Sequence, residues 1–351
     1  MTQASNPADF CLTPGAFVQC PCRVVCRAVF YETAQAKSFV LEDRLGRSFF
    51  FKPGQYATLK LVIDGKIHQR AYSIASAPTR SGNLQITVKR VPGGVGSNWL
   101  NDTLAVGAEI EITAIGGAFN FTDLPSDKPL LLSGGSGITP VMSMLRALTD
   151  SASDLDITFV HFARDPSDVI FRDELALIAK RFTNVTVHLV VDDASSDPAF
   201  TGTQGRISAD LLRQLVPDHA ERTIYMCGPE GFMRAARDIT AEVAVKARHQ
   251  ESFGQALPVV ADAALGRQVE FTLSGRTRTC APGETLLQVA LDAGIWIESS
   301  CQQGVCGNCK VRLLEGAVDM ADLGGLQEYE RNNGYVLACC SRPTGPVRLE
   351  I

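Results

Sequence analysis

Four cysteines near the C-terminal end of this sequence have the residue type and the spacing of a metal-cluster site. They follow a C-x4-C-x2-C spacing with one further cysteine thirty residues on, and they are Cys301, Cys306, Cys309 and Cys339. Four thiolates in this spacing are typical of a plant-type [2Fe–2S] cluster. Gly304 and Gly307 lie within the loop, where their conformational freedom lets amide N–H groups turn toward the sulfur atoms. The sequence therefore predicts an iron–sulfur cluster on these thiolates.

Other uses of these thiols fit less well. A structural zinc site usually shows two short C-x2-4-C pairs, and this segment has one, formed by Cys306 and Cys309. A disulfide framework belongs to secreted proteins, and nothing near Met1 resembles a secretion signal. Cys340 stands directly beside Cys339, and we take Cys339 as the ligand and Cys340 as its neighbour.

A second group of residues suits a flavin. Arg70, Tyr72 and Ser73 lie in one predicted strand and supply a guanidinium for phosphate oxygens, an aromatic ring for the isoalloxazine or ribityl group, and a hydroxyl near N5. Taken alone, a strand with exposed polar residues explains them equally well. The segment Val88–Leu100 then carries a glycine-rich turn into a short helix whose amides could hold a pyrophosphate. We place four of its residues at the cofactor: Val88, Lys89, Gly96 and Ser97.

A third group suits a dinucleotide. The apolar run 130–133 predicts a strand buried on both faces, and Gly134-Gly-Ser-Gly-Ile-Thr-Pro140 follows it before a helix. This turn lets a phosphate approach the backbone at the helix N-terminus, although plain packing explains a lone turn of this kind equally well. Cys227 ends a later strand, before Gly228 and Pro229, at the edge where open α/β sheets bind ligands. Burial as a small apolar side chain is the alternative for Cys227.

The choice of nicotinamide nucleotide depends on charge after the second strand of this sheet, where a basic cluster would select a 2′-phosphate. Arg164 lies there, but Asp165 and Asp168 flank it and would repel a phosphate. We therefore expect NADH, with NADPH as the alternative.

The elements that must position these groups form three domains. Short strands rich in Val, Ile, Phe and Thr predict an antiparallel β-barrel for the flavin over residues 17–124. Alternating strands and helices predict a parallel-sheet α/β domain for NAD(P)H over 125–254. Residues 255–267 are small and apolar and are expected to be a linker. Residues 268–351 are expected to form an α+β ferredoxin domain of the β-grasp type that carries the cluster.

Length and charge exclude several classes of function. The chain has 351 residues, 45% apolar and 20% charged, with a net charge of −5 and no basic run. These values predict folded domains rather than disorder and exclude nucleic acid as a partner. We expect no membrane span and a cytoplasmic location, because eleven cysteines without an export signal fit a reducing compartment.

Across almost its full length the sequence resembles the ferredoxin–NADP reductase superfamily, with a plant-type ferredoxin domain appended. The resemblance rests on Arg70-x-Tyr72-Ser73, the turn at 134–140, Cys227-Gly-Pro229, Glu251-Ser-Phe253 and the cysteine spacing. Several further stretches, such as Phe50-Phe-Lys-Pro-Gly-Gln55, are similar to reductases of Rieske-type monooxygenases that demethylate glycine betaine and related quaternary amines.

This resemblance implies an activity and roles for residues. It implies FAD, with FMN as the alternative, bound by Arg70, Tyr72, Ser73 and Ser97. It implies a nicotinamide nucleotide beside Gly137, Thr139, Cys227 and Gly228, and Glu251 and Phe253 at the flavin face. We list Ser73, Cys227, Glu251 and Phe253 as catalytic candidates.

The resulting hypothesis is an NADH-dependent oxidoreductase that passes electrons from FAD to the cluster and on to a separate Rieske-type oxygenase. The sequence contains no Rieske C-x-H pair, so the oxygen chemistry would belong to the partner. Three alternatives stay open: a reductase for a hybrid-cluster protein, an oxidoreductase for a small quinone or dye, and a flavoprotein whose last domain is a zinc-holding interaction module.

Overall fold

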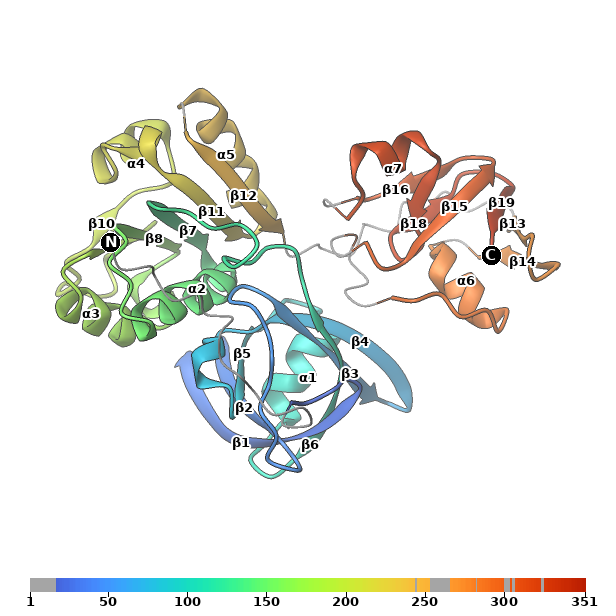
Figure 1. The fold of residues 1–351 in the computed structure, drawn as a ribbon, viewed down its shortest axis with the longest axis horizontal. Helices are drawn as coiled ribbons and strands as arrows, with labels where there is room; N and C mark the ends of the chain where they lie inside the picture. Colours follow the sequence, from blue (N-terminus) through green and yellow to red (C-terminus); the bar gives the residue numbers. More distant parts are fainter. Residues whose placement is uncertain are drawn as a thin grey trace, which may run out of the picture.

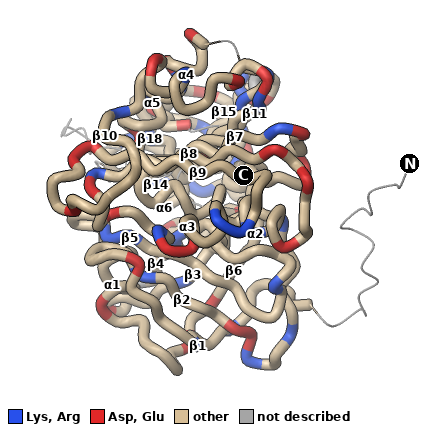
Figure 2. Tube along the Cα trace, turned by 90° about the vertical axis from the view of Figure 1, so that its left-hand side faces the viewer, with Lys and Arg blue, Asp and Glu red and all other residues tan. Residues whose placement is uncertain are grey.

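The chain folds into three units, which Figure 1 shows as the barrel at the bottom, the nucleotide domain at the left and the third domain at the right. The structure is a computed structural model and describes residues 17–243, 245–252, 266–281, 283–299, 304, 307–322 and 325–351. Among these residues, no helix is both long enough and apolar enough to cross a membrane. Basic and acidic residues are interspersed along the trace on the face seen in Figure 2.

The first unit is an antiparallel barrel. Its six strands run in the order β4-β3-β6-β1-β2-β5. Their bounds are β1 (Cys22–Thr33), β2 (Ala36–Asp43), β3 (Tyr56–Ile63), β4 (Lys66–Ser73), β5 (Leu84–Lys89) and β6 (Glu109–Gly116). A bridge between Ile74 and Ile86 joins the end of β4 to β5, so the two edges of the sheet meet. Alternate side chains such as Phe39, Leu41 and Leu59 fill the interior, as period-2 strands require.

The sequence also predicts a strand at Ser48–Phe51, and this prediction is wrong. Residues 48–51 form no strand, and Ser48 alone makes a bridge, to Phe17. The Phe49 N–H donates to the Ser81 carbonyl instead, at 2.7 Å, and Pro53 follows closely without an N–H to continue a ladder.

The second unit is a six-stranded parallel sheet in the order β10-β9-β8-β7-β11-β12. Its strands are β7 (Pro129–Gly134), β8 (Ile157–Ala163), β9 (Val185–Val191), β10 (Thr203–Gln204), β11 (Thr223–Gly228) and β12 (Ala247–Ser252). Its helices are α2 (Ile138–Asp150), α3 (Arg172–Arg181), α4 (Ala209–Leu215) and α5 (Glu230–Glu242). Apolar clusters cover both faces of the sheet, which explains why β7 and β8 read as continuous apolar runs.

Two boundaries in this unit differ from expectation. The sequence predicts a helix at Val169–Arg181, but the helix begins at Arg172, because Phe171 adopts a left-handed backbone with φ of 59°. The sequence also predicts a closing helix at Glu230–Lys246. This helix ends at Glu242, and strand β12, which the sequence does not predict, follows it. β12 is an edge strand of mostly polar residues, so it lacked the apolar pattern that marks a strand.

The third unit is a five-stranded mixed sheet in the order β14-β13-β19-β15-β17, the β-grasp arrangement. Its strands are β13 (Arg267–Phe271), β14 (Arg276–Cys280), β15 (Lys310–Glu315), β17 (Tyr335–Leu337) and β19 (Val347–Glu350), and β16 (Val318–Met320) pairs with β18 (Ser341–Pro343) outside it. The helices are α6 (Leu286–Asp292) and α7 (Glu328–Asn332). Cys309, Cys339 and Cys340 belong to its apolar core.

Candidate functional site

The two flavin motifs meet on one side of the barrel. Arg70 and Tyr72 lie on β4, and Gly96 lies in the first turn of α1 (Val95–Thr103). A Cβ built on Gly96 would lie 3.0 Å from Arg70 Cγ and 3.2 Å from Tyr72 Oη. The helix N-terminus therefore packs directly against the arginine and the phenol. The Arg70 guanidinium itself donates to the Gln69 carbonyl at 2.7 Å. An arginine, a phenol and a helix N-terminus in contact are residue types and backbone groups that fit a flavin nucleotide.

The Ser97 and Val88 side chains have different surroundings from each other. Ser97 is buried, and its Oγ accepts a hydrogen bond of 3.2 Å from the Val91 N–H, which fixes the glycine-rich turn to α1. The Val88 side chain packs in the barrel core and does not face the motif. Its carbonyl accepts a bond of 3.1 Å from Asn101 Nδ2, so Val88 holds α1 in place through its backbone.

The nucleotide turn is built around the close approach of Gly137 to β11. A Cβ on Gly137 would lie 2.2 Å from the Cys227 carbonyl oxygen and 2.4 Å from the Gly228 nitrogen. Only glycine fits between these backbones. Thr139 is buried, and its Oγ1 donates to the Ser136 carbonyl at 3.0 Å, which closes the turn ahead of α2. Pro229, after Gly228 of β11, occupies the N-cap position of α5.

Four polar side chains form a row across this sheet. The strand register pairs Glu251 with Cys227, Cys227 with Ser133, and Ser133 with His161. Residues paired across neighbouring strands project from the same face of a sheet. Ser133 Oγ and His161 Nδ1 share a hydrogen bond of 2.9 Å, whereas His161 Nε2 has no hydrogen-bond partner among the described residues.

The row reaches the flavin motif through Ser73. Ser73 Oγ at the end of β4 donates to Glu251 Oε2 at 3.3 Å, so this bond joins the barrel to the nucleotide domain. Three catalytic candidates of the sequence, Ser73, Cys227 and Glu251, thus lie together. The fourth, Phe253, lies outside the described residues.

Burial controls the charge of this row. It raises the pKa of the Glu251 carboxyl to about 8, against the opposing effect of the Ser73 hydrogen bond. Burial, with a smaller contribution from Glu251, raises the pKa of the Cys227 thiol well above its usual range. Burial and then the Lys89 charge lower the pKa of His161 to about 3. At pH 7 this row of side chains therefore carries hydrogen-bonding groups without net charge.

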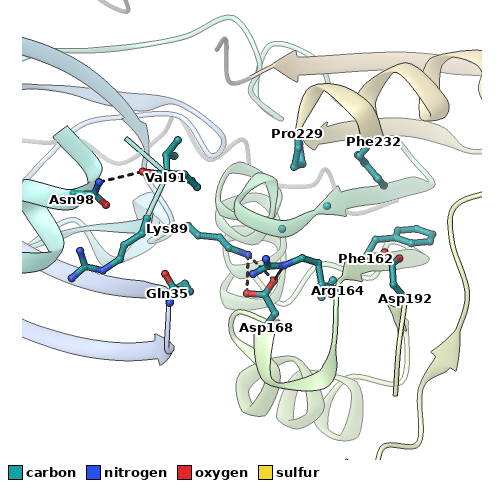
Figure 3. Close-up of a pocket in the computed structure, with 15 residues that line it drawn as sticks. Gln35, Lys89, Val91, Asn98, Phe162, Arg164, Asp168, Asp192, Pro229 and Phe232 are labelled. Carbon is teal, nitrogen blue, oxygen red and sulfur yellow. Dashed lines mark hydrogen bonds and ion pairs between the residues drawn. The ribbon is translucent and has the colours of Figure 1, made fainter. Parts of the chain in front are cut away.

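A cavity of about 740 Å³ lies between the barrel and the carboxyl edge of the parallel sheet. Its volume is that of a typical cofactor site. The barrel side contributes residues such as Gln35, Lys89 and Asn98, and the other side contributes Gly134, Gly135 and Pro229 (Figure 3). Lys89 therefore faces the nucleotide domain rather than the flavin motif. Asp168 was named from the sequence as a neighbour of Arg164, but its contact with Lys89 was not expected: its oxygens lie 2.7 and 2.8 Å from Lys89 Nζ.

The described part of the cluster loop brings two of the expected ligands together. Cys309 and Cys339 are both buried, and the Cys339 thiol lies within hydrogen-bonding reach of the Cys309 thiol, the Cys340 thiol and the Gly304 backbone. Cys301 and Cys306 lie outside the described residues. The thiols and the amide present fit a cluster with thiolate ligands and amide donors to sulfur.

The loop glycines adopt the conformation that the cluster loop needs. Gly304 and Gly307 have φ values of 74° and 77°. A Cβ on Gly304 would lie 2.4 Å from the Ala321 carbonyl oxygen and 2.9 Å from Cys340 Sγ. A larger residue would therefore be strained by its backbone and would displace a neighbouring chain segment.

Family comparisons match all three units. Residues 32–121 match an oxidoreductase FAD-binding domain, residues 131–238 an oxidoreductase NAD-binding domain, and residues 271–344 a 2Fe-2S iron-sulfur cluster binding domain. The last match favours a [2Fe–2S] cluster over the zinc alternative for the third unit.

Relatives match this chain over nearly its whole length. The chain is 39% identical to the glycine betaine monooxygenase reductase subunit of Pseudomonas aeruginosa, covering 93% of this chain and 94% of the relative. It is 37% identical to the stachydrine N-demethylase reductase subunit Stc4 of Rhizobium meliloti, covering 91% and 93%. Among solved structures, phthalate dioxygenase reductase matches with a TM-score of 0.70 and 27% identity, covering 94% of this chain and 97% of that one.

Proposed function

This chain belongs to the family of FAD- and [2Fe–2S]-containing NAD(P)H oxidoreductases, and we propose that it is the reductase component for a Rieske-type oxygenase. The oxygenase would be a separate protein that demethylates glycine betaine or a related quaternary amine. NADH would be the electron donor.

The similarity to the glycine betaine monooxygenase reductase subunit, which spans 93% of this chain, carries the proposal. The aligned region includes all three units. It therefore includes the cluster domain as well as the flavin and nucleotide domains that many oxidoreductases share. The reductase subunit of stachydrine N-demethylase, also similar over nearly the whole length, supports a methylated amine as the partner's substrate.

The residues of the site have separate tasks in this proposal. Arg70, Tyr72 and Ser97 hold the FAD at the N-terminus of α1. The flavin, when bound, supplies the conversion between a two-electron hydride donor and a one-electron acceptor. Gly137 and Thr139 shape the nucleotide turn.

The neutral row beside the flavin motif would position the nicotinamide. Ser73 and Cys227 would orient the reacting rings, and Glu251 would hold Ser73 through the bond of 3.3 Å. Since Glu251 is buried and protonated at neutral pH, it can keep this contact without placing a charge beside the rings.

Four of the six cysteines of the last unit would hold the cluster, with Cys339 rather than Cys340 as the fourth ligand. Plant-type clusters have potentials of roughly −400 mV, whereas Rieske centres lie between roughly −150 and +300 mV. Electron flow from this chain to a Rieske partner is therefore downhill. The domain boundaries that we propose for this relay are 17–124, 125–254 and 268–351, with a linker at 255–267.

Reconstitution with the purified oxygenase tests the function. Cys339→Ser should abolish NADH-driven demethylation of glycine betaine yet retain NADH-driven reduction of ferricyanide, which takes electrons from the flavin. Cys340→Ser is the matched control, because Cys340 is adjacent and equally buried, with 7% of its surface exposed, and it should retain both activities.

Each alternative has its own outcome in the same assay. If Cys339→Ser demethylated at the full rate and Cys340→Ser did not demethylate, Cys340 rather than Cys339 would be the fourth ligand. The electron relay itself would not be contradicted. Demethylation by both variants at the wild-type rate would contradict the relay. Reduction of a hybrid-cluster protein, and of no oxygenase, would assign the chain to that other kind of partner.

A further inference from the structure

Three charged side chains meet across the cavity between the barrel and the nucleotide domain. Lys89 Nζ lies 2.7 Å from Asp168 Oδ2, and Arg164 Nε lies 2.8 Å from the same oxygen. Lys89 comes from the end of β5 in the barrel, whereas Arg164 and Asp168 follow β8 (Figure 3). Asp168 is only 6% exposed and Lys89 17%, so their ion pair is well shielded from solvent.

This ion cluster lies where the phosphates of a dinucleotide would bind. A Cβ built on Gly135 would lie 4.0 Å from Lys89 Nζ, and Gly135 belongs to the turn that precedes α2. Gly134, Gly135, Lys89, Arg164 and Asp168 all line the same cavity. A nucleotide with its diphosphate on this turn would therefore contact Lys89 and compete with Asp168 for it.

The other charges around the cavity are paired as well. Arg90, the third cation in the lining, holds Asp102. Asp192, at the end of β9, lies 3.3 Å from Arg206 Nε. Among the described residues that line the cavity, every Lys and Arg side chain thus already holds a carboxylate. A 2′-phosphate, which adds up to two negative charges to the nucleotide, would have to displace one of them.

We propose that Asp168 determines nucleotide specificity in this reductase by occupying Lys89 and Arg164. This inference rests on the proposed function and deepens it, because it names the residue that makes the chain use NADH. Asp168 is a positioning residue, because it acts through the two cations that it holds. The diphosphate, common to both nucleotides, can draw Lys89 away. Arg164 then stays with Asp168 and is withheld from a third phosphate.

Steady-state reduction of ferricyanide by NADH and by NADPH tests this proposal on the full-length holoprotein. Asp168→Asn keeps the shape of the side chain and removes its charge. Arg164 is then free for a charge-assisted bond to the 2′-phosphate, so we expect kcat/KM for NADPH to rise by about tenfold relative to that for NADH. We expect the change mainly in KM, because the neutral row beside the flavin is untouched.

Asp165→Asn is the matched control. It removes the same charge from the same loop, but the Asp165 carboxylate accepts from the Ser167 N–H and hydroxyl and does not bond Arg164. In this variant the ratio of kcat/KM for NADPH to kcat/KM for NADH should stay within about twofold of the wild-type ratio. An equal rise in both variants would mean that the net charge of the loop, and not the Asp168 contact, sets the specificity, and would overturn the proposal.

Arg164→Ala provides a test that does not depend on the stability of Asp168→Asn. Arg164 is 69% exposed, so its replacement is structurally mild. In the wild-type background it should leave the NADPH to NADH ratio within about twofold, and combined with Asp168→Asn it should remove the gain in NADPH use. A loss of NADPH use of about tenfold in Arg164→Ala alone would show that Arg164 is already free, and the proposal would fall.

The same measurements separate this inference from the proposed function. Failure of the wild type to oxidise either nucleotide would contradict the function itself. Oxidation of NADH by the wild type with an unchanged nucleotide ratio in Asp168→Asn would contradict only the role of Asp168.

Discussion

Glu251 is a carboxylic acid that is almost fully buried. It is 5% exposed, and Ser73 donates a hydrogen bond of 3.3 Å to it across the domain boundary. Burial raises its pKa to about 8, so the folded protein keeps it protonated under conditions where the unfolded chain ionises it. Its protonation therefore couples stability to pH.

Replacing Glu251 tests this coupling. The unfolded carboxyl titrates near 4.5 and the folded one near 8, so folding binds a proton between these values and stability falls as pH rises through that window. Glu251→Gln lacks this titration. We expect the wild type to lose on the order of a few kcal/mol relative to the variant between pH 5 and pH 8, and no more above about pH 9.

The measurement is the difference in melting temperature between the two proteins at each pH. Other titrating groups are common to both proteins and cancel in this difference. Parallel pH profiles for wild type and Glu251→Gln would contradict the raised pKa.

At the scale of elements, the turn before α2 packs closely against the backbone of strand β11 in the nucleotide domain. The Cα of Gly137 faces the Cys227 carbonyl so closely that a methyl group would lie 2.2 Å from the oxygen. The neighbours are backbone atoms on a central strand, so they cannot move aside as a flexible side chain would.

Gly137→Ala should therefore push α2 from β11 and destabilise the domain by about 1–3 kcal/mol, as overpacking in a core does. NADH affinity should fall with it, because the same turn forms the nucleotide site. Gly231→Ala in α5 is the control: a Cβ there meets nothing within 4 Å, and alanine should leave stability unchanged or raise it slightly. Chemical unfolding and NADH titration measure both effects, and equal stability of the two variants would contradict the packing argument.

The elements also show which features the sequence could predict. The apolar run of β7, the glycine turn and the cysteine spacing are local patterns, and each led to the correct type of domain. β12 escaped prediction because an edge strand of polar residues has no apolar period, although it carries Glu251. Asp168 was recognised as a charge near Arg164, but its contact with Lys89 depends on the packing of two domains, which no local pattern encodes. The row from Glu251 to His161 likewise depends on strand order.

At the scale of the whole molecule, three units arranged in one chain account for a relay from a hydride donor to a one-electron acceptor. The barrel and nucleotide domain are joined by Ser73 with Glu251 and by Lys89 with Asp168, so these contacts link the flavin motif and the nucleotide cavity. The cluster domain has its own apolar core. Its cysteines hold the last redox centre of the relay.

An anaerobic titration of the purified protein with NADH, followed by visible absorption and accompanied by iron and flavin analysis, tests this relay most directly. We expect about two irons per flavin and bleaching of both the flavin and the cluster bands by NADH, with only the flavin band remaining to bleach in Cys339→Ser. Bleaching of the flavin alone in wild-type protein with a full complement of iron would contradict electron transfer between the domains. A flavin spectrum without iron would contradict the cluster and, with it, the role as an oxygenase reductase.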